Sequence, residues 1–259
     1  MEIVYPPVIG AARLMFRALD LRITVRGAEH VPPTGGAVLA SNHVSYLDFI
    51  FCGLAGVERK RLPRFMAKQE VFANPVAGPL MRGMHHIPVD RSAGSGSFRE
   101  AMKALKAGEV IGVFPEATIS RSFTVKEIKS GAVRLAMATG TPLVPVALWG
   151  GQRILTKDLP RDFRTRGRAL TIAVGEPLHP TRADDAAALT DQLRQRMQEL
   201  LEHAQKTHPD QPRTGEDAPW HPRHLGGTAP TPEQAAELDR AEMAARAAKR
   251  RERAAKRRR

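Results

Sequence analysis

The sequence has a single cysteine, Cys52, among 259 residues, so no disulfide can form within the chain. A chain without disulfides fits a reducing compartment. The sequence also lacks any apolar run of the roughly 18–20 residues that a membrane-spanning helix needs, because its longest uncharged stretch, residues 135–152, is broken by Gly140, Pro142 and Pro145. Near the N-terminus, Arg13 and Arg17 interrupt the apolar residues, which argues against a signal peptide. We therefore expect a soluble or peripheral protein.

The net charge of +13 is distributed unevenly along the chain. Residues 240–259 contain ten lysines and arginines against two glutamates, which accounts for +8 of the total, and the first 239 residues carry the remaining +5. The strong basicity is therefore a property of the C-terminal segment. It says little about the partners of the folded part.

The composition changes at His208. Six prolines with few apolar residues between them fall in residues 209–232, which predicts a disordered linker. Residues 233–256 are rich in Ala, Glu, Arg and Lys, good helix formers with little to bury. They predict a disordered or transiently helical, solvated tail, with attachment to anionic lipid or nucleic acid as the alternative. We expect one domain over residues 1–207 and a linker with a basic tail over residues 208–259.

Short apolar segments typical of buried strands alternate with segments that have helical periodicity. Strands separated by helices predict an α/β domain with a mixed, largely parallel sheet flanked by helices. The expected strands cover residues 23–25, 37–40, 65–67, 86–89, 110–114, 143–148 and 170–174, and the expected helices cover residues 47–54, 97–107, 131–139 and 189–204.

An amphipathic helix is also expected within residues 1–20, because the apolar residues of the segment 8–19 lie broadly on one side of a helix. Two interpretations remain open. The helix packs on its own domain, or it lies on an anionic membrane surface.

His43 and Asp48 lie where an apolar run ends in a polar turn and a second apolar run begins. On one straight helix, residues five apart point about 140° away from each other. The two side chains can therefore meet only if His43 lies in the turn and Asp48 in the first helical turn. There the carboxylate would bind one ring nitrogen and leave the other as a base.

The same His-x4-Asp spacing occurs at His85/Asp90 and at His179/Asp184, so the spacing alone decides nothing. Only the first pair has a strand–turn–helix context, and a capping or structural role for His43 is the alternative. In parallel sheets, sites gather at the carboxyl ends of strands. Polar clusters follow three of the expected strands: Asn42-His43, Asp90-Arg91 and Pro115-Glu116-Ala117-Thr118.

Four segments in order resemble the glycerophospholipid acyltransferases of the bacterial 1-acylglycerol-3-phosphate acyltransferase type. They are Asn42-His43-x4-Asp48; Gly83 followed by Ile87-Pro88-Val89-Asp90-Arg91; Phe114-Pro115-Glu116-Ala117-Thr118; and Val144-Pro145-Val146. A lysine-x-glutamate, Lys68 and Glu70, lies between the first two. The chain departs from the family pattern at Ala117, where the family usually has glycine, and at Ile119, where it usually has arginine, with Arg121 two residues later.

The resemblance implies transfer of a fatty acyl chain from a thioester to a glycerol hydroxyl, without a metal or a cofactor. His43 would be the general base, oriented by Asp48. The expected co-substrate is acyl-CoA or acyl-carrier protein, and the expected partners are a lysophospholipid acceptor and an anionic membrane surface. The implied location is cytoplasmic, on the inner face of the cell membrane. The candidate substrate-binding residues are Asn42, Ser45, Lys68, Arg91, Glu116, Ala117, Thr118 and Arg121.

Two alternatives remain open at this point. An enzyme with the same chemistry could use another lysolipid or a lipid amine as acceptor, in keeping with the departures at Ala117 and Ile119. A nucleic-acid-binding module is suggested by the basic tail, but the tail lacks interleaved aromatic residues and any recognition motif. Nucleic acid is therefore not an expected partner.

Overall fold

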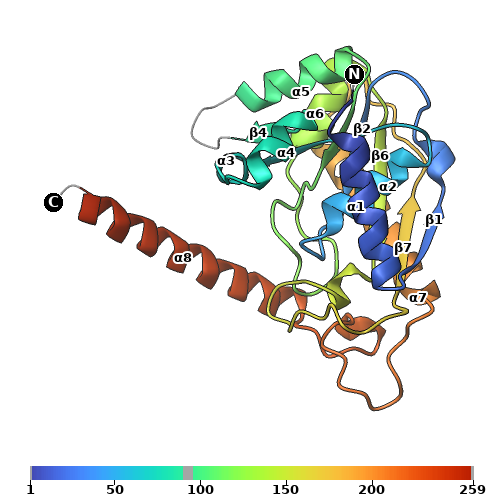
Figure 1. Cartoon of the computed structure of the whole chain (residues 1–259), viewed down its shortest axis with the longest axis vertical. Helices are drawn as coiled ribbons and strands as arrows, with labels where there is room; N and C mark the ends of the chain where they lie inside the picture. Colours follow the sequence, from blue (N-terminus) through green and yellow to red (C-terminus); the bar gives the residue numbers. More distant parts are fainter. Residues whose placement is uncertain (1, 90–95, 258–259) are drawn as a thin grey trace.

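The computed structural model describes residues 2–89 and 96–257. A seven-stranded sheet with the order β1-β7-β6-β2-β5-β3-β4 forms the centre of the molecule (Figure 1). All neighbouring pairs are parallel except β6 and β7, which are antiparallel. The sheet is thus mixed and largely parallel, as expected. The strands are β1 (Arg22–Arg26), β2 (Ala37–Ser41), β3 (Arg64–Lys68), β4 (Ile87–Val89), β5 (Val110–Val113), β6 (Leu143–Trp149) and β7 (Ala169–Val174).

Helices cover both faces of the sheet. One apolar core lies between the sheet and helices α1 and α2, and the other lies between the sheet and helices α5, α6 and α7. The middle strands β2, β5 and β6 are buried along their whole length, which explains their continuous apolar runs. The helices are α1 (Tyr5–Ala18), α2 (Asp48–Val57), α3 (Gln69–Phe72), α4 (Ala77–Gly83), α5 (Gly96–Lys106), α6 (Gly131–Thr139), α7 (Ala186–Thr207) and α8 (Pro232–Arg257), with short 3₁₀ turns η1 (Ala28–His30), η2 (Gly151–Arg153) and η3 (Arg223–Leu225).

The N-terminal helix α1 packs on the domain. Tyr5 and Phe16 are buried on its inner side, and Phe16 contacts Phe51 of α2 with 5.8 Å between the ring centroids. Leu14 is 70% exposed on its outer side. The helix therefore packs on its own domain and still presents an outer surface with apolar and basic residues.

The expectation of a disordered linker from residue 208 onward is wrong. Residues 208–231 fold back over the end of β6, where His208 and His221 are buried and contact the ring of Trp149. Backbone hydrogen bonds close the segment on itself, for example from Thr228 to Ala218 at 3.0 Å. Composition alone misjudged the segment because a few ring contacts and hydrogen bonds, rather than a long apolar run, hold it in place.

Residues 232–257 form helix α8, one of the two states expected for the tail. Its C-terminal half projects away from the rest of the molecule (Figure 1). The described side chains from Met243 to Lys249 are exposed, in agreement with a solvated tail. In the part of the chain that the structure describes, no helix combines the length and apolar character needed to cross a membrane.

Candidate active site

The turn after β2 brings His43 and Asp48 together. His43 lies in the turn, Asp48 is the first residue of α2, and His43 Nδ1 is 2.9 Å from Asp48 Oδ2. The same oxygen accepts the backbone N–H groups of Val44 at 2.6 Å and Ser45 at 2.7 Å. This is the arrangement that the spacing required: the histidine before the helix and the carboxylate at its start.

The pair is buried on the side of Asp48 and open on the side of His43. The Asp48 side chain is 0% exposed, whereas the His43 side chain is 22% exposed. Burial raises the pKa of Asp48, and its bonds to His43 and to the backbone oppose this rise. With Nδ1–H donating to Asp48, the lone pair of His43 is on Nε2, at the accessible edge of the ring.

The loop after β5 approaches the same turn. Glu116 is buried, and its two carboxylate oxygens accept the backbone N–H groups of His43 at 2.9 Å and Lys126 at 3.2 Å. Burial raises the pKa of Glu116 to about 7. Glu116 therefore ties two loops together. Next to it, Ala117 has a φ of +61°, the left-handed conformation that glycine adopts without cost.

Two predicted substrate-binding residues use their polar atoms within the turn. The Asn42 side chain donates to the carbonyl of Leu148 at 3.0 Å and accepts its N–H at 2.7 Å. Ser45 Oγ donates to the carbonyl of Leu155 at 2.7 Å and accepts the N–H of Leu47 at 3.1 Å. In the structure both residues position the turn, which is the role that their location favours over direct contact with a ligand.

The third polar cluster falls partly outside the described residues. Arg91 and Asp90 follow β4 and are not among them. Lys68 ends the neighbouring strand β3, where it is exposed and paired in register with Val89 of β4. Because β2 and β5 are adjacent and parallel, the polar residues that follow these two strands lie at one edge of the sheet, as predicted.

Arg121 differs from the expectation that it is available to a ligand. Its guanidinium is buried and makes ion pairs with Asp158, Asp239 and Glu242. Thr118 accepts a 2.7 Å hydrogen bond from Lys157 Nζ, a residue that the sequence did not single out. Among the described residues, no three His, Cys, Asp or Glu side chains are grouped as a metal site would require.

A stack of aromatic rings runs from His43 through Phe114 to Phe65 of β3. The His43 ring stacks on Phe114 with 4.5 Å between centroids, and Phe114 stacks on Phe65 at 6.1 Å. Gly112 makes room for this stack, because a Cβ at that position would lie 2.3 Å from the Phe65 ring. Sequence reasoning missed Phe65 and Phe114 as site residues, although Phe114 directly precedes the Pro115-Glu116 cluster.

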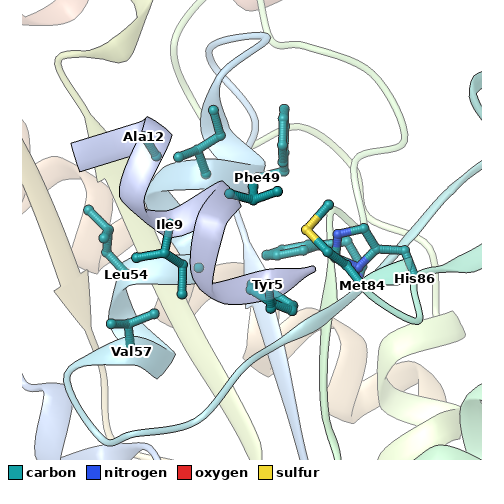
Figure 2. A pocket seen from close by; sticks show the side chains of 12 residues that line it. Tyr5, Ile9, Ala12, Phe49, Leu54, Val57, Met84 and His86 are labelled. Carbon is teal, nitrogen blue, oxygen red and sulfur yellow. The ribbon is translucent and has the colours of Figure 1, made fainter. Parts of the chain in front are cut away.

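A small apolar pocket of about 60 Å³ lies at the far end of this stack. Its walls come from α1, α2 and the segment that precedes β4, and their side chains point toward a common space (Figure 2). His86 lines it in a neutral state, because burial lowers the pKa of this histidine to about 4. The lining includes Tyr5, Ile9, Phe49, Leu54, Phe65 and Met84.

Comparison with known proteins assigns a family to this arrangement. A family model described as Acyltransferase matches residues 22–149. The 1-acyl-sn-glycerol-3-phosphate acyltransferase of Bacillus subtilis is 33% identical over 198 residues, which cover 71% of this chain and 93% of that protein. The alpha form of the mouse enzyme with the same name is 32% identical over 185 residues, which cover 68% of this chain and 62% of the mouse protein.

The fold also matches a solved structure. The crystal structure of the 1-acyl-sn-glycerophosphate acyltransferase PlsC from Thermotoga maritima superposes with a TM-score of 0.67 and covers 80% of this chain and 81% of that one. At 23% sequence identity, this likeness supports the fold.

Proposed function

Since the chain belongs to the acyltransferase family, as an enzyme of the 1-acylglycerol-3-phosphate acyltransferase type, we propose that its acceptor is 1-acylglycerol 3-phosphate. The reaction would move a fatty acyl group from a thioester to the free glycerol hydroxyl and give phosphatidic acid. The observation that carries the proposal is the His43–Asp48 pair, a partly exposed histidine whose Nδ1 faces a buried carboxylate.

In this mechanism His43 is the general base. Nε2 takes the proton of the acceptor hydroxyl while its oxygen attacks the thioester carbonyl carbon. Asp48 holds the ring through Nδ1 and stabilises the imidazolium that forms. The tetrahedral intermediate then breaks its carbon–sulfur bond, and the leaving thiolate takes the proton from His43. The hydroxyl attacks directly, so the acyl group never becomes attached to the protein.

The apolar pocket is the proposed site of an acyl chain. It is lined almost entirely by apolar side chains, and the Phe65–Phe114 stack runs from its wall to His43. An extended chain in the pocket would therefore place its carboxyl end near the turn.

The polar groups around the turn are the proposed acceptor contacts. Lys68 ends strand β3 beside β4, and Arg91, which lies outside the described residues, follows β4 in the sequence; cationic side chains such as these suit a phosphate group. Thr118 lies in the loop that Glu116 attaches to the catalytic turn. Asn42, Ser45, Glu116 and Ala117 act on the acceptor indirectly, by fixing the shape of the turn and of this loop.

We place the enzyme at the cytoplasmic face of the cell membrane, with acyl-CoA or acyl-carrier protein as the donor. Three exposed apolar side chains support a membrane-facing surface: Leu14 on α1 and Val76 and Leu80 near α4. The two helices adjoin each other, because a Cβ at Gly83 of α4 would lie 2.5 Å from the Val4 side chain, just before α1. Basic side chains on α1 suit anionic headgroups.

A second acceptor class is favoured by one observation. At position 119, where the family usually has arginine, this chain has a buried isoleucine, and the nearby Arg121 is bound by three carboxylates. The position of the cation in this loop therefore differs from the usual family pattern. Another lysophospholipid or a lipid amine is therefore the alternative acceptor. A panel of lysolipids with one acyl chain and different headgroups separates the two possibilities, because no preference for 1-acylglycerol 3-phosphate would favour the alternative.

The deciding experiment measures thiol release from oleoyl-CoA and palmitoyl-CoA in the presence of 1-acylglycerol 3-phosphate. We expect acceptor-dependent release by the unmodified protein and a loss of about 10²–10⁴-fold in His43→Ala. His179→Ala is the matched control, because exposed His179 has the same spacing to an aspartate but lies away from the turn. Full activity of folded His43→Ala would end the proposed mechanism.

A further inference from the structure

Three cationic side chains gather beside the catalytic turn. Arg121 and Lys126 come from the loop after β5, and Lys157 comes from the loop after η2. The side chains of Arg121 and Lys157 are each only 8% exposed. The backbone N–H of Ser120, next to Arg121, donates to the carbonyl of His43 at 2.7 Å, so the cationic cluster (Arg121, Lys126 and Lys157) directly adjoins the catalytic residue.

Two carboxylates of the C-terminal helix α8 neutralise this cluster. Asp239 pairs with Arg121, and its other oxygen is 2.9 Å from Lys126 Nζ. Glu242 lies 3.0 Å from Arg121 and 2.9 Å from Lys157 Nζ. The hydrogen bonds from Lys157 and Arg121 lower the pKa of Glu242 to about 2, so this carboxylate is ionised under ordinary conditions.

Little else holds α8 against the domain. Between Pro232 and Lys249, the side chains that are not exposed are Ala235, Asp239 and Glu242, spaced four and three residues apart on one helical face. The larger apolar residues face solvent, with Leu238 45% and Met243 64% exposed. The contact is therefore made by one alanine and a pair of acids, and its attraction is mainly electrostatic. In such a contact, another anion can replace the carboxylates of Asp239 and Glu242 on the cationic cluster.

The carboxylate pair has the charge of a phosphate monoester. A phosphate monoester carries about −1.5 to −2 charges and three acceptor oxygens near neutral pH, and two ionised carboxylates carry −2. Arginine and lysine side chains bind both groups by the same charge-assisted hydrogen bonds. Partly buried cations without counter-charges are costly, so an anion that replaces α8 would be favoured over an empty site.

We propose that Arg121, Lys126 and Lys157 form a binding site for the phosphate monoester group of a substrate, and that α8 occupies this site with Asp239 and Glu242 as an intramolecular competitor. This inference rests on the proposed function, because it assumes a phosphate-bearing substrate next to His43. Two substrates carry such a group: the glycerol phosphate of the acceptor and the 3′-phosphate of coenzyme A. Lys126 and Lys157 thereby join Arg121 as ligand-binding residues.

The first test measures binding of 1-oleoylglycerol 3-phosphate in detergent micelles by titration calorimetry, without any donor. The Asp239→Asn/Glu242→Gln variant should bind about fivefold more tightly or better, which is the lower end of typical coupling between competing ligands. Glu233→Gln/Glu237→Gln is the matched control. It removes two charges from exposed positions of the same helix and should leave the affinity unchanged.

The second test follows amide hydrogen exchange of residues 235–246. Exchange should rise when a phosphate-bearing ligand displaces α8. 1-Oleoylglycerol 3-phosphate compared with 1-oleoylglycerol, and coenzyme A compared with 3′-dephospho-coenzyme A, identify which substrate supplies the phosphate. A rise with either phosphate-bearing member, absent with its partner, supports the site.

Equal affinities in the two double variants, together with unchanged exchange in every arm, would overturn the inference. Both readouts measure binding alone. An absence of acyl transfer would therefore contradict the proposed function but would leave open whether α8 competes with a phosphate-bearing ligand. Failure of the proposed function and failure of this inference can thus be told apart.

Discussion

The proposed catalytic turn, residues 42–48, and the contact of α8 with the domain both contain charged groups, but they hold these groups by different means. Asp48 is held within six residues of chain, by one ring nitrogen and two backbone N–H groups. The cationic cluster is held across 118 residues, from Arg121 to Asp239, by side chains alone. Backbone donors are fixed once the turn folds, whereas side chains can change partners. Asp48 is therefore held by the fold of the turn itself, whereas the ion pairs of α8 depend on side chains that can change partners.

The difference extends to the surrounding apolar packing. The turn lies between buried strands and is covered by the Phe114 ring. Helix α8 contributes one buried alanine. Fully burying a large apolar side chain stabilises a protein by roughly 1.5–3 kcal/mol, whereas the attraction within a partly buried ion pair is largely offset by the desolvation of its two charges. We therefore expect large effects from changes in the turn and small effects on stability from changes in α8.

Replacing Asp48 gives the largest expected effect. In Asp48→Ala, the buried N–H groups of Val44 and Ser45 lose their acceptor, and the His43 ring loses its orientation. We expect acyl transfer to fall about 10²–10⁴-fold and the free energy of unfolding to fall by about 3 kcal/mol. Chemical denaturation and the thiol-release assay measure the two quantities. Asp191→Ala, at an exposed acid of α7, is the control, and equal stability of the two variants would contradict the described role of Asp48.

The buried Glu116, which accepts the backbone N–H of His43, should make the free energy of unfolding depend on pH. Burial raises the pKa of this carboxyl from 4.5 to about 7, so between these values the folded protein binds more protons than the unfolded chain. Stabilisation by protonated Glu116 is complete below pH 4.5 and is lost as the pH rises through 7, a change of about 3 kcal/mol. Glu116→Gln should remove this slope, although its amide also costs a constant amount because it cannot accept both N–H groups. Urea unfolding at several pH values measures the slope. Glu127→Gln, at an exposed position, should retain it.

Two truncations compare the C-terminal segments directly. Deleting residues 232–259 removes α8 and should lower the free energy of unfolding by about 1 kcal/mol, because removing the helix returns the cationic cluster to water and recovers most of the desolvation cost of these ion pairs. Deleting residues 208–259 also uncovers Trp149, which His208 and His221 contact, and should cost at least about 3 kcal/mol. Thermal and urea unfolding of both proteins provide the measurement. Similar losses in the two truncations would contradict the division between a packed segment and a weakly held helix.

Ala117 gives the smallest expected effect. Its left-handed backbone costs about 1–2 kcal/mol relative to a regular conformation. Ala117→Gly should therefore stabilise the protein by about 1 kcal/mol after the entropy of glycine in the unfolded chain is subtracted. Ala11→Gly, in the regular helix α1, should have the opposite sign with a similar size. Denaturation midpoints distinguish the two, and a loss of stability in both would show that residue 117 carries no backbone strain.

Features formed by residues close together in the sequence could be predicted, whereas features formed by residues far apart in the sequence could not. The His43–Asp48 pair was predictable because five residues and one turn decide its geometry. The meeting of the loops after β2 and β5 was predictable because parallel strands share an edge. The Phe65–Phe114 stack was not, since it depends on the register of β3 against β5 and on the space left by Gly112.

The C-terminal region was hardest to predict for the same reason. Its ion pairs join residues more than 80 positions apart, and no local pattern shows that Asp239 and Lys126 will meet. The folded state of residues 208–231 likewise depends on Trp149, which lies in another part of the sequence. The role of Arg91 stays a prediction, because it lies outside the described residues.

The position of α1 affects how a lipid chain can enter and leave the proposed acyl site. The inner side of this helix forms a wall of the pocket, and its outer side carries exposed Leu14 beside Arg13 and Arg17. Moving a chain of roughly 16 carbons from lipid through water costs about 12 kcal/mol, or some nine orders of magnitude in partitioning. A pocket separated from the proposed membrane surface by one helix would let the chain pass sideways and avoid that barrier. The residence time of the product would then be set by how often α1 moves away from α2.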